Sequence, residues 1–230
     1  FTVSVNGKYT GIYNDNNLWG GNVNFGYFDF EAGNSINVIV TYSGSIDSFE
    51  ILPKGFNIQA EKVSDNTLSF QINNIEQYVT LIINDNYKGD VLHLFANSID
   101  KNIPDVTQKE GYYFDKKQGI HYFGPGYYKL SEMFSNGTLS VNKNKVIYLA
   151  GGAVLDGQLG FNQSSSAEIR GRGMIMNKEE KGMDNRVVLS VSASTGGTIE
   201  GIIIHGHRAP GWVCTNDKSS GLSYRNVKIV

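Results

Sequence analysis

The sequence has little of what marks several large classes of protein. It contains a single cysteine, Cys214, which excludes an internal disulfide framework and any cysteine-based zinc site. No apolar run approaches the roughly 18 residues of a membrane-spanning helix. Lys and Arg number 20 against 22 Asp and Glu, and no five-residue run carries one sign of charge. We therefore expect no nucleic-acid partner and no membrane span, and a neutral or weakly charged ligand suits the chain better.

Proline is also scarce, with four residues, and helical periodicity is weak throughout. What the chain has instead is aromatic residues, including 13 tyrosines and 12 phenylalanines, within an ordinary globular composition of 40% apolar and 18% charged residues. Aromatic and β-branched residues favour strands. The composition therefore predicts an all-β protein of one or two domains.

The first hundred residues alternate between apolar and polar positions in short segments that turn residues separate. Such alternation is typical of strands with one face buried, and seven or eight strands at this spacing predict a β-sandwich. The segments are residues 2–7, 27–33, 36–42, 48–53, 67–72, 78–84 and 91–96. Residues 98–115 then lose the alternation. We predict a sandwich domain over 1–105, a linker over 106–119 and a second domain over 120–230.

The second domain repeats one pattern instead of alternating. Segments that start at residues 145, 167, 198 and 222 each place apolar residues on both sides of a glycine or polar break, at intervals of 22, 31 and 24 residues. A strand that recurs every 20 to 30 residues indicates a solenoid, in which each coil buries its inner residues against the next coil. The strand-like segment 186–192 fits as another face of the longest coil. The fold predicted for 120–230 is the first coils of a right-handed parallel β-helix.

Three other folds fit this half less well. A second sandwich or a jelly roll would also give short strands, but neither accounts for the glycine break that recurs at Gly171 and Gly201. A dinucleotide-binding unit needs a helix after the glycines. The pair Gly151-Gly152 precedes Ala153-Val-Leu-Asp-Gly-Gln-Leu, which is strand-like and has no helix cap. The glycine pair is therefore interpreted as a bend between two faces of one coil.

The order of these motifs resembles a known enzyme family. Residues 147–157 (IYLAGGAVLDG), 169–175 (IRGRGMI), 199–212 (IEGIIIHGHRAPGW) and 223–229 (SYRNVKI) are similar to the first coils of β-helical glycoside hydrolases of the dextranase/isopullulanase and polygalacturonase types. The dextranase type also places a β-sandwich before the helix. The resemblance covers residues 120–230, and the first hundred residues only by architecture.

This resemblance implies hydrolysis of a polysaccharide between two carboxyl groups, one of which protonates the leaving oxygen while the other activates water. In the family these carboxylates are Asp residues on coils that follow the strand matching 226–229. We therefore expect the catalytic carboxylates beyond residue 230 and expect the 230-residue chain to be inactive alone. The chain also ends on an apolar strand without a polar cap, which predicts a truncated helix or association through an open C-terminal coil.

Three carboxylates within the chain are weak catalytic candidates. Asp156 follows the glycine pair, Asp184 lies in a polar loop, and Asp217 follows the strand-like segment near the chain end. Each is also the type of residue that turns and solvated loops use. No two of them stand out as an acid and base pair.

The densest group of functional side chains is His205, His207, Arg208 and Trp212. If 198–204 is a strand, this segment projects from the edge of a coil. Arg208 could then hold a hydroxyl or carboxylate by charge-assisted hydrogen bonds, and Trp212 could stack on a sugar ring. Trp212 is equally consistent with a core position. Two histidines without a third ligand make a poor metal site, so we expect no metal and no cofactor.

The favoured function is the N-terminal portion of a secreted or periplasmic polysaccharide-degrading glycoside hydrolase, acting on an α-glucan, a pectic chain or a related glycan. The alternative is a non-catalytic carbohydrate-binding or structural β module. A third hypothesis, an oligomeric fibre with the helix as its stalk, would reveal itself by oligomerisation. A reading frame that supplies further coils with Asp residues on one face favours the enzyme.

Overall fold

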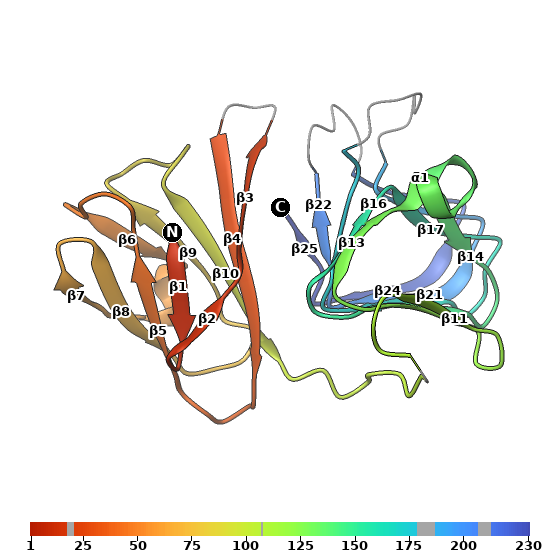
Figure 1. Ribbon diagram of the computed structural model, residues 1–230, viewed down its shortest axis with the longest axis horizontal. Helices are drawn as coiled ribbons and strands as arrows, with labels where there is room; N and C mark the ends of the chain where they lie inside the picture. Colours follow the sequence, from red (N-terminus) through yellow and green to blue (C-terminus); the bar gives the residue numbers. More distant parts are fainter. Residues whose placement is uncertain (18–20, 107, 179–186, 207–212) are drawn as a thin grey trace. The chain divides into compact units, whose positions relative to one another are not determined.

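The chain folds into two compact units, Phe1–Lys101 and Asn102–Val230, in a computed structural model that describes residues 1–17, 21–106, 108–178, 187–206 and 213–230 (Figure 1). Nearly all of its regular structure is strand. The described helical segments are one turn each: η1 (Lys54–Phe56), α1 (Leu130–Met133) and η2 (Ser135–Gly137). None of them is long and apolar enough to cross a membrane. The all-β prediction is confirmed.

Unit 1 is a β-sandwich of two five-stranded sheets. The first has the order β2-β1-β5-β8-β7 and is antiparallel throughout; in the second, β3-β4-β10-β9-β6, only β4 and β10 run parallel. The strands are β1 (Thr2–Val5), β2 (Lys8–Thr10), β3 (Ile12–Asn17), β4 (Gly21–Phe30), β5 (Ile36–Thr41), β6 (Phe49–Leu52), β7 (Ala60–Ser64), β8 (Thr67–Ile72), β9 (Tyr78–Ile83) and β10 (Val91–Ser98).

The alternation in the sequence builds the sandwich core. Along β5, Val38 and Val40 are fully buried, whereas Ile39 between them faces away from the core. These valines pack with Leu81 of β9 and Leu94 of β10 in one apolar cluster, so the two sheets face each other across it. Because successive side chains of a strand point to opposite faces, the residues between the buried ones form the outer face of each sheet.

Unit 2 winds into a parallel β-solenoid of about four turns. Each complete coil contributes one strand to each of three parallel sheets, here called sheets C, D and E. Sheet C contains β12 (Ile120–Phe123), β15 (Val146–Leu149), β18 (Glu168–Gly171), β21 (Thr195–Glu200) and β24 (Ser220–Arg225). Sheet D contains β13 (Gly126–Lys129), β16 (Ala153–Asp156), β19 (Met174–Met176), β22 (Ile203–His205) and β25 (Lys228–Ile229). Sheet E contains β14 (Thr138–Val141), β17 (Gln158–Asn162), β20 (Leu189–Ser192) and β23 (Cys214–Asp217).

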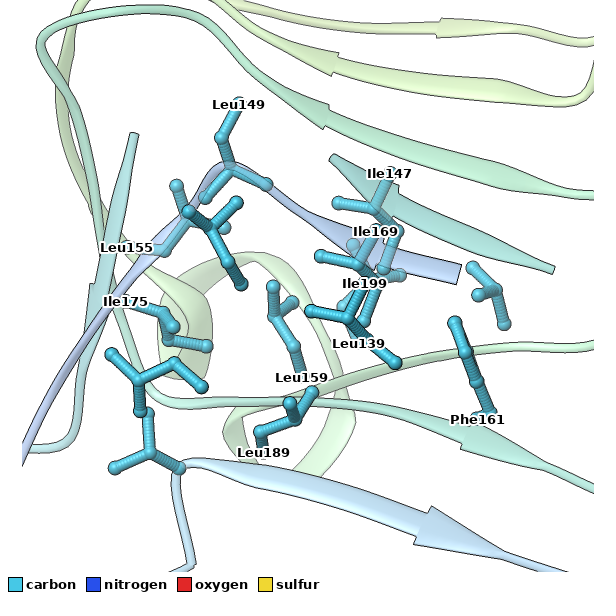
Figure 2. Close-up of a cluster of buried hydrophobic side chains, with 14 of the residues drawn as sticks. Leu139, Ile147, Leu149, Leu155, Leu159, Phe161, Ile169, Ile175, Leu189 and Ile199 are labelled. Atoms are coloured by element: carbon cyan, nitrogen blue, oxygen red, sulfur yellow. The ribbon is translucent and has the colours of Figure 1, made fainter. Parts of the chain in front are cut away.

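Identical positions of successive coils stack inside the solenoid. Ile147, Ile169 and Ile199 occupy paired positions of β15, β18 and β21, and all three are fully buried. Figure 2 shows these isoleucines above one another, with Leu159 and Leu189 stacked in the same way on the opposite wall. The interior is therefore a set of apolar ladders, which explains why apolar residues recur coil by coil in the sequence.

The repeats predicted from the sequence prove to be the passage from sheet C to sheet D in successive coils. The segments that start at 145, 167, 198 and 222 overlap β15, β18, β21 and β24 of sheet C, and the chain continues after each break into β16, β19, β22 and β25 of sheet D. The pair Gly151-Gly152 forms the turn between β15 and β16, where sheet C passes to sheet D. Gly152 has a φ of +83°, a left-handed conformation that favours glycine. The glycine pair thus turns a corner of a coil.

The corners of the coils differ in length. Between sheets C and D the chain takes two residues in four coils and three in the coil of Gly151. Between sheets D and E it takes 8, 1, 12 and 8 residues in successive coils, from β13–β14 to β22–β23. The corner between sheets D and E therefore accounts for most of the unequal spacing of the repeats.

The first coil is covered by β11 (Tyr112–Asp115), which pairs antiparallel with β12. This strand lies within the segment 106–119 that the sequence predicted to be a linker. His121 of β12 points to the interior, stacks on the Phe114 ring at 4.2 Å and forms a hydrogen bond through Nδ1 with the Tyr112 hydroxyl at 3.0 Å. Burial, with a smaller contribution from Lys145, lowers the pKa of His121 to about 4. The ring is therefore a neutral core residue at pH 7.

Candidate functional site

The outer face of sheet C carries two columns of polar side chains along the solenoid axis. Paired positions of successive coils hold Glu168, Thr198 and Ser223 in one column. The neighbouring column holds Tyr148, Arg170, Glu200 and Arg225. Neighbouring strands lie about 4.8 Å apart, so each column offers one side chain per coil at that spacing. The charges in the second column alternate in sign from one coil to the next.

Arg170 is the centre of this arrangement. Its Nε donates to Glu168 Oε2 at 2.9 Å, and one terminal nitrogen donates to the carbonyl oxygen of Asn102. The guanidinium carbon also lies 5.5 Å from the centre of the Tyr148 ring. Tyr148 is in turn stacked on Tyr122, with ring centres 5.5 Å apart. Contacts on three sides hold the guanidinium in one orientation, and 18% of the side chain stays exposed.

A groove of about 510 Å³ opens over these side chains. Asn102 and Ile103 line it together with Glu168, Arg170, Thr198, Glu200 and Arg225. Its two carboxylates accept hydrogen bonds, its two guanidinium groups donate them, and the charges cancel in sum. Such a lining suits a polar ligand that offers both donors and acceptors.

Asp156, a weak catalytic candidate, is held by its own surroundings. It is 3% exposed at the end of β16. One carboxylate oxygen accepts a hydrogen bond from the Lys178 backbone N–H at 2.7 Å, and the other accepts one from the Tyr127 hydroxyl. These contacts are those of a residue that fixes the chain at a coil corner.

His205 and Asp217 lie on different sheets. His205 ends β22 in sheet D and is 3% exposed, two strands away from Asp156 in the same column. Asp217 ends β23 in sheet E, with a side chain that is 65% exposed and an oxygen 3.9 Å from Lys218 Nζ. The structure thus brings His205 and Asp156 to one sheet and places Asp217 on another.

The remaining predicted residues, Asp184, His207, Arg208 and Trp212, lie outside the described residues. By chain order, Asp184 belongs to the connection between β19 and β20, and the other three to the connection between β22 and β23. Both connections lead from sheet D to sheet E. Across the described ranges, no three His, Cys, Asp or Glu side chains gather as the ligands of a metal ion would.

The groove residues were missed by reasoning from the sequence, although a signal was present. In the repeats that identified the solenoid, Arg170 and Glu200 each stand between an inward isoleucine and a glycine, and Arg225 stands at the matching place after Tyr224. The recurring position places these side chains in one outward column. Aligning the polar residues of the repeats as well as the apolar ones would have found it.

Comparisons with known proteins gave a structural match only. No family model and no curated protein matches the sequence. Dex49A from Penicillium minioluteum is similar in structure, with a TM-score of 0.66 and 16% sequence identity, over 92% of this chain and 48% of that one. The chain thus spans about half the length of Dex49A. At this identity the likeness shows the fold alone, a β-solenoid.

Proposed function

We propose that this chain is the N-terminal portion of a polysaccharide-degrading glycoside hydrolase that acts on an α-glucan, a pectic chain or a related glycan. The observation that carries the proposal is the structural match to Dex49A, a dextranase, over 92% of the chain. The order of the sequence motifs between residues 147 and 229 independently indicates the same type of enzyme.

The groove on sheet C supports a glycan as the ligand. A linear polysaccharide presents hydroxyl groups at regular intervals, and the columns present hydrogen-bonding side chains at regular intervals along the solenoid. Arg170 is fixed by Glu168, Asn102 and Tyr148, so little side-chain entropy is lost when it donates to a hydroxyl. In this proposal His207, Arg208 and Trp212 provide further substrate contacts from the connection between β22 and β23, whereas His205, the predicted fourth contact, is 3% exposed at the end of β22.

We place the catalytic carboxylates beyond residue 230. Hydrolysis of a glycosidic bond needs two carboxyl groups, roughly 5 to 9.5 Å apart depending on the stereochemistry. Asp156 is engaged by Tyr127 and Lys178, and Asp217 is exposed on another sheet. Dex49A is about twice as long as this chain, which leaves room for such a pair on later coils. A polymeric substrate also favours a secreted or periplasmic enzyme.

Reducing-sugar release from dextran, pullulan and polygalacturonate tests the proposal. The 230-residue chain should release none, and turnover by it would refute the location of the carboxylates. The native protein, expressed to its natural stop codon, should hydrolyse one of these polymers. If it hydrolyses none of the three but binds one of them, the protein is a carbohydrate-binding module instead.

A further inference from the structure

The outer face of the β2-β1-β5-β8-β7 sheet in unit 1 is rich in hydroxyl and amide groups. Along β5 and β8, every second residue is buried in the sandwich core, and the intervening residues face outward. Those outward residues are Asn37, Ile39 and Thr41 on β5, and Thr67, Ser69 and Gln71 on β8. None of the six is charged.

A groove of about 450 Å³ lies on one end of this face, beside the segment that leads from η1 into β7. Its volume is within the range of small-molecule sites, roughly 300–1,000 Å³. Its lining includes five carboxamide side chains that come from three parts of unit 1: Asn37, Asn57, Gln59, Gln71 and Asn73.

The amide oxygens on the sheet are already engaged, which leaves their NH₂ groups as donors. Ser69 Oγ donates to Asn37 Oδ1 at 3.0 Å. Ser35 Oγ donates to Asn73 Oδ1 at 2.7 Å and lies 3.3 Å from Gln71 Oε1. Asn37 and Gln71 are paired across β5 and β8, so their amide groups stand next to each other in the groove wall. These contacts orient the donors before any ligand arrives.

The side chains that line the groove favour a neutral sugar over an anionic ligand. Glu61 alone is ionisable among the residues lining the groove, all of which the structure describes. An anionic ligand would meet this carboxylate and no cation. Phe56 and Ile58 are half-buried and add apolar atoms, on which the C–H face of a sugar ring can pack. Neighbouring NH₂ donors match adjacent sugar hydroxyls, because each hydroxyl oxygen can accept a hydrogen bond.

We propose that this groove is a second glycan site, which binds a neutral oligosaccharide or polysaccharide without cleaving it. The site would hold the polymer through unit 1, independently of the groove on sheet C. The inference goes beyond the proposed hydrolysis and does not depend on it, because binding here requires no catalytic carboxylate.

Affinity electrophoresis of the 230-residue chain tests the site, in gels that contain dextran, pullulan, laminarin, galactomannan or polygalacturonate. At least one neutral polymer should retard the protein, and polygalacturonate should not. The double variant Asn37→Ala/Gln71→Ala should weaken retardation about tenfold, since it removes two hydrogen-bonding groups. The control Thr41→Ala/Thr67→Ala changes the same two strands on the same face, outside the groove, and should bind like the unmodified chain.

The outcomes of the electrophoresis either support or contradict a glycan site in this groove. Circular dichroism spectra and melting temperatures first establish that both double variants are folded. The proposal is wrong if none of the four neutral polymers retards the chain, if polygalacturonate retards it most, or if both double variants bind equally. Loss of binding in Arg170→Ala alone would assign the glycan to the groove on sheet C. Hydrolysis is read separately, so failure of this site leaves the proposed function untouched.

Discussion

Gly171 is the residue at which the stacking of the coils can be tested most directly. It ends β18 with a φ of +129° and pairs with Leu149 of the preceding coil. A Cβ atom at this position would lie 2.0 Å from the carbonyl oxygen of Leu149, far inside van der Waals contact. That oxygen accepts hydrogen bonds from the backbone N–H groups of Arg172 and Gly173, at 2.8 and 3.1 Å. The Gly171→Ala substitution must therefore move the carbonyl and weaken both bonds.

The cost of Gly171→Ala follows from these contacts. The left-handed backbone costs a residue with a Cβ about 1–2 kcal/mol. Each lost backbone hydrogen bond adds about 1 kcal/mol. The sum predicts that the free energy of unfolding of unit 2 falls by about 3–4 kcal/mol, which is a large share of the stability of an ordinary domain.

Gly151→Ala is the matched control. A Cβ at Gly151 would come no closer than 3.9 Å to its nearest neighbour, Arg172 Cβ, and the residue has no left-handed φ. This variant should be neutral or up to about 1 kcal/mol more stable, because alanine restricts the unfolded chain. Urea unfolding followed by the near-ultraviolet circular dichroism of the tyrosines measures both. Equal unfolding midpoints for the two variants would refute the register of β15 against β18.

Three other parts of unit 2 give measurable outcomes. The pKa of His121 is about 4 in the folded chain and 6.5 when unfolded, so the unfolded chain binds more protons between these values. The free energy of unfolding is therefore highest above pH 6.5 and should fall by roughly 2 kcal/mol towards pH 4. The protection of residues 112–123 against hydrogen exchange should decrease over this pH range. The His121→Phe variant should not show this pH dependence. Ile169→Ala should lower the free energy of unfolding, measured in urea, by about 2–5 kcal/mol, because it removes a buried member of the isoleucine ladder. The control Ile229→Ala, at a position that is 62% exposed, should lower it by less than about 0.5 kcal/mol. Similar losses in the two variants would contradict the stacking of Ile147, Ile169 and Ile199. Arg170→Ala should lower the free energy of unfolding by about 1–2 kcal/mol through the loss of its contacts with Glu168 and Tyr148. Unchanged stability would mean that these contacts do not stabilise unit 2.

The solenoid could be predicted from the sequence because the buried apolar positions repeat from coil to coil. Ile147, Ile169 and Ile199 must all be apolar, since each stacks on the next in a dry interior. The same constraint revealed the corner at Gly151-Gly152. The expected linker, by contrast, includes β11, whose four residues are only half-buried and so show no clear alternation.

The groove residues escaped prediction because outward side chains obey no such constraint. Water accepts almost any polar residue on the outer face of a coil, so Arg170 and Glu200 are recognised as neighbours only when the polar positions of the repeats are aligned. Asp156 was a candidate because carboxylates do chemistry, but its hydrogen bonds to Lys178 and Tyr127 depend on residues that are distant in sequence. Only the register of the coils shows which polar residues become neighbours.

The unequal corners between sheets D and E have a consequence for how such a protein changes over generations. Residues can be added at this corner, where 1 to 12 separate the strands, while the ladders above and below keep their positions. Each coil contacts only its neighbours, so an insertion in one leaves the others undisturbed. The solenoid therefore separates a constant frame from a set of loops that can vary one at a time. By chain order His207, Arg208 and Trp212 belong to one of those connections, between β22 and β23, where a substitution leaves the ladders in place.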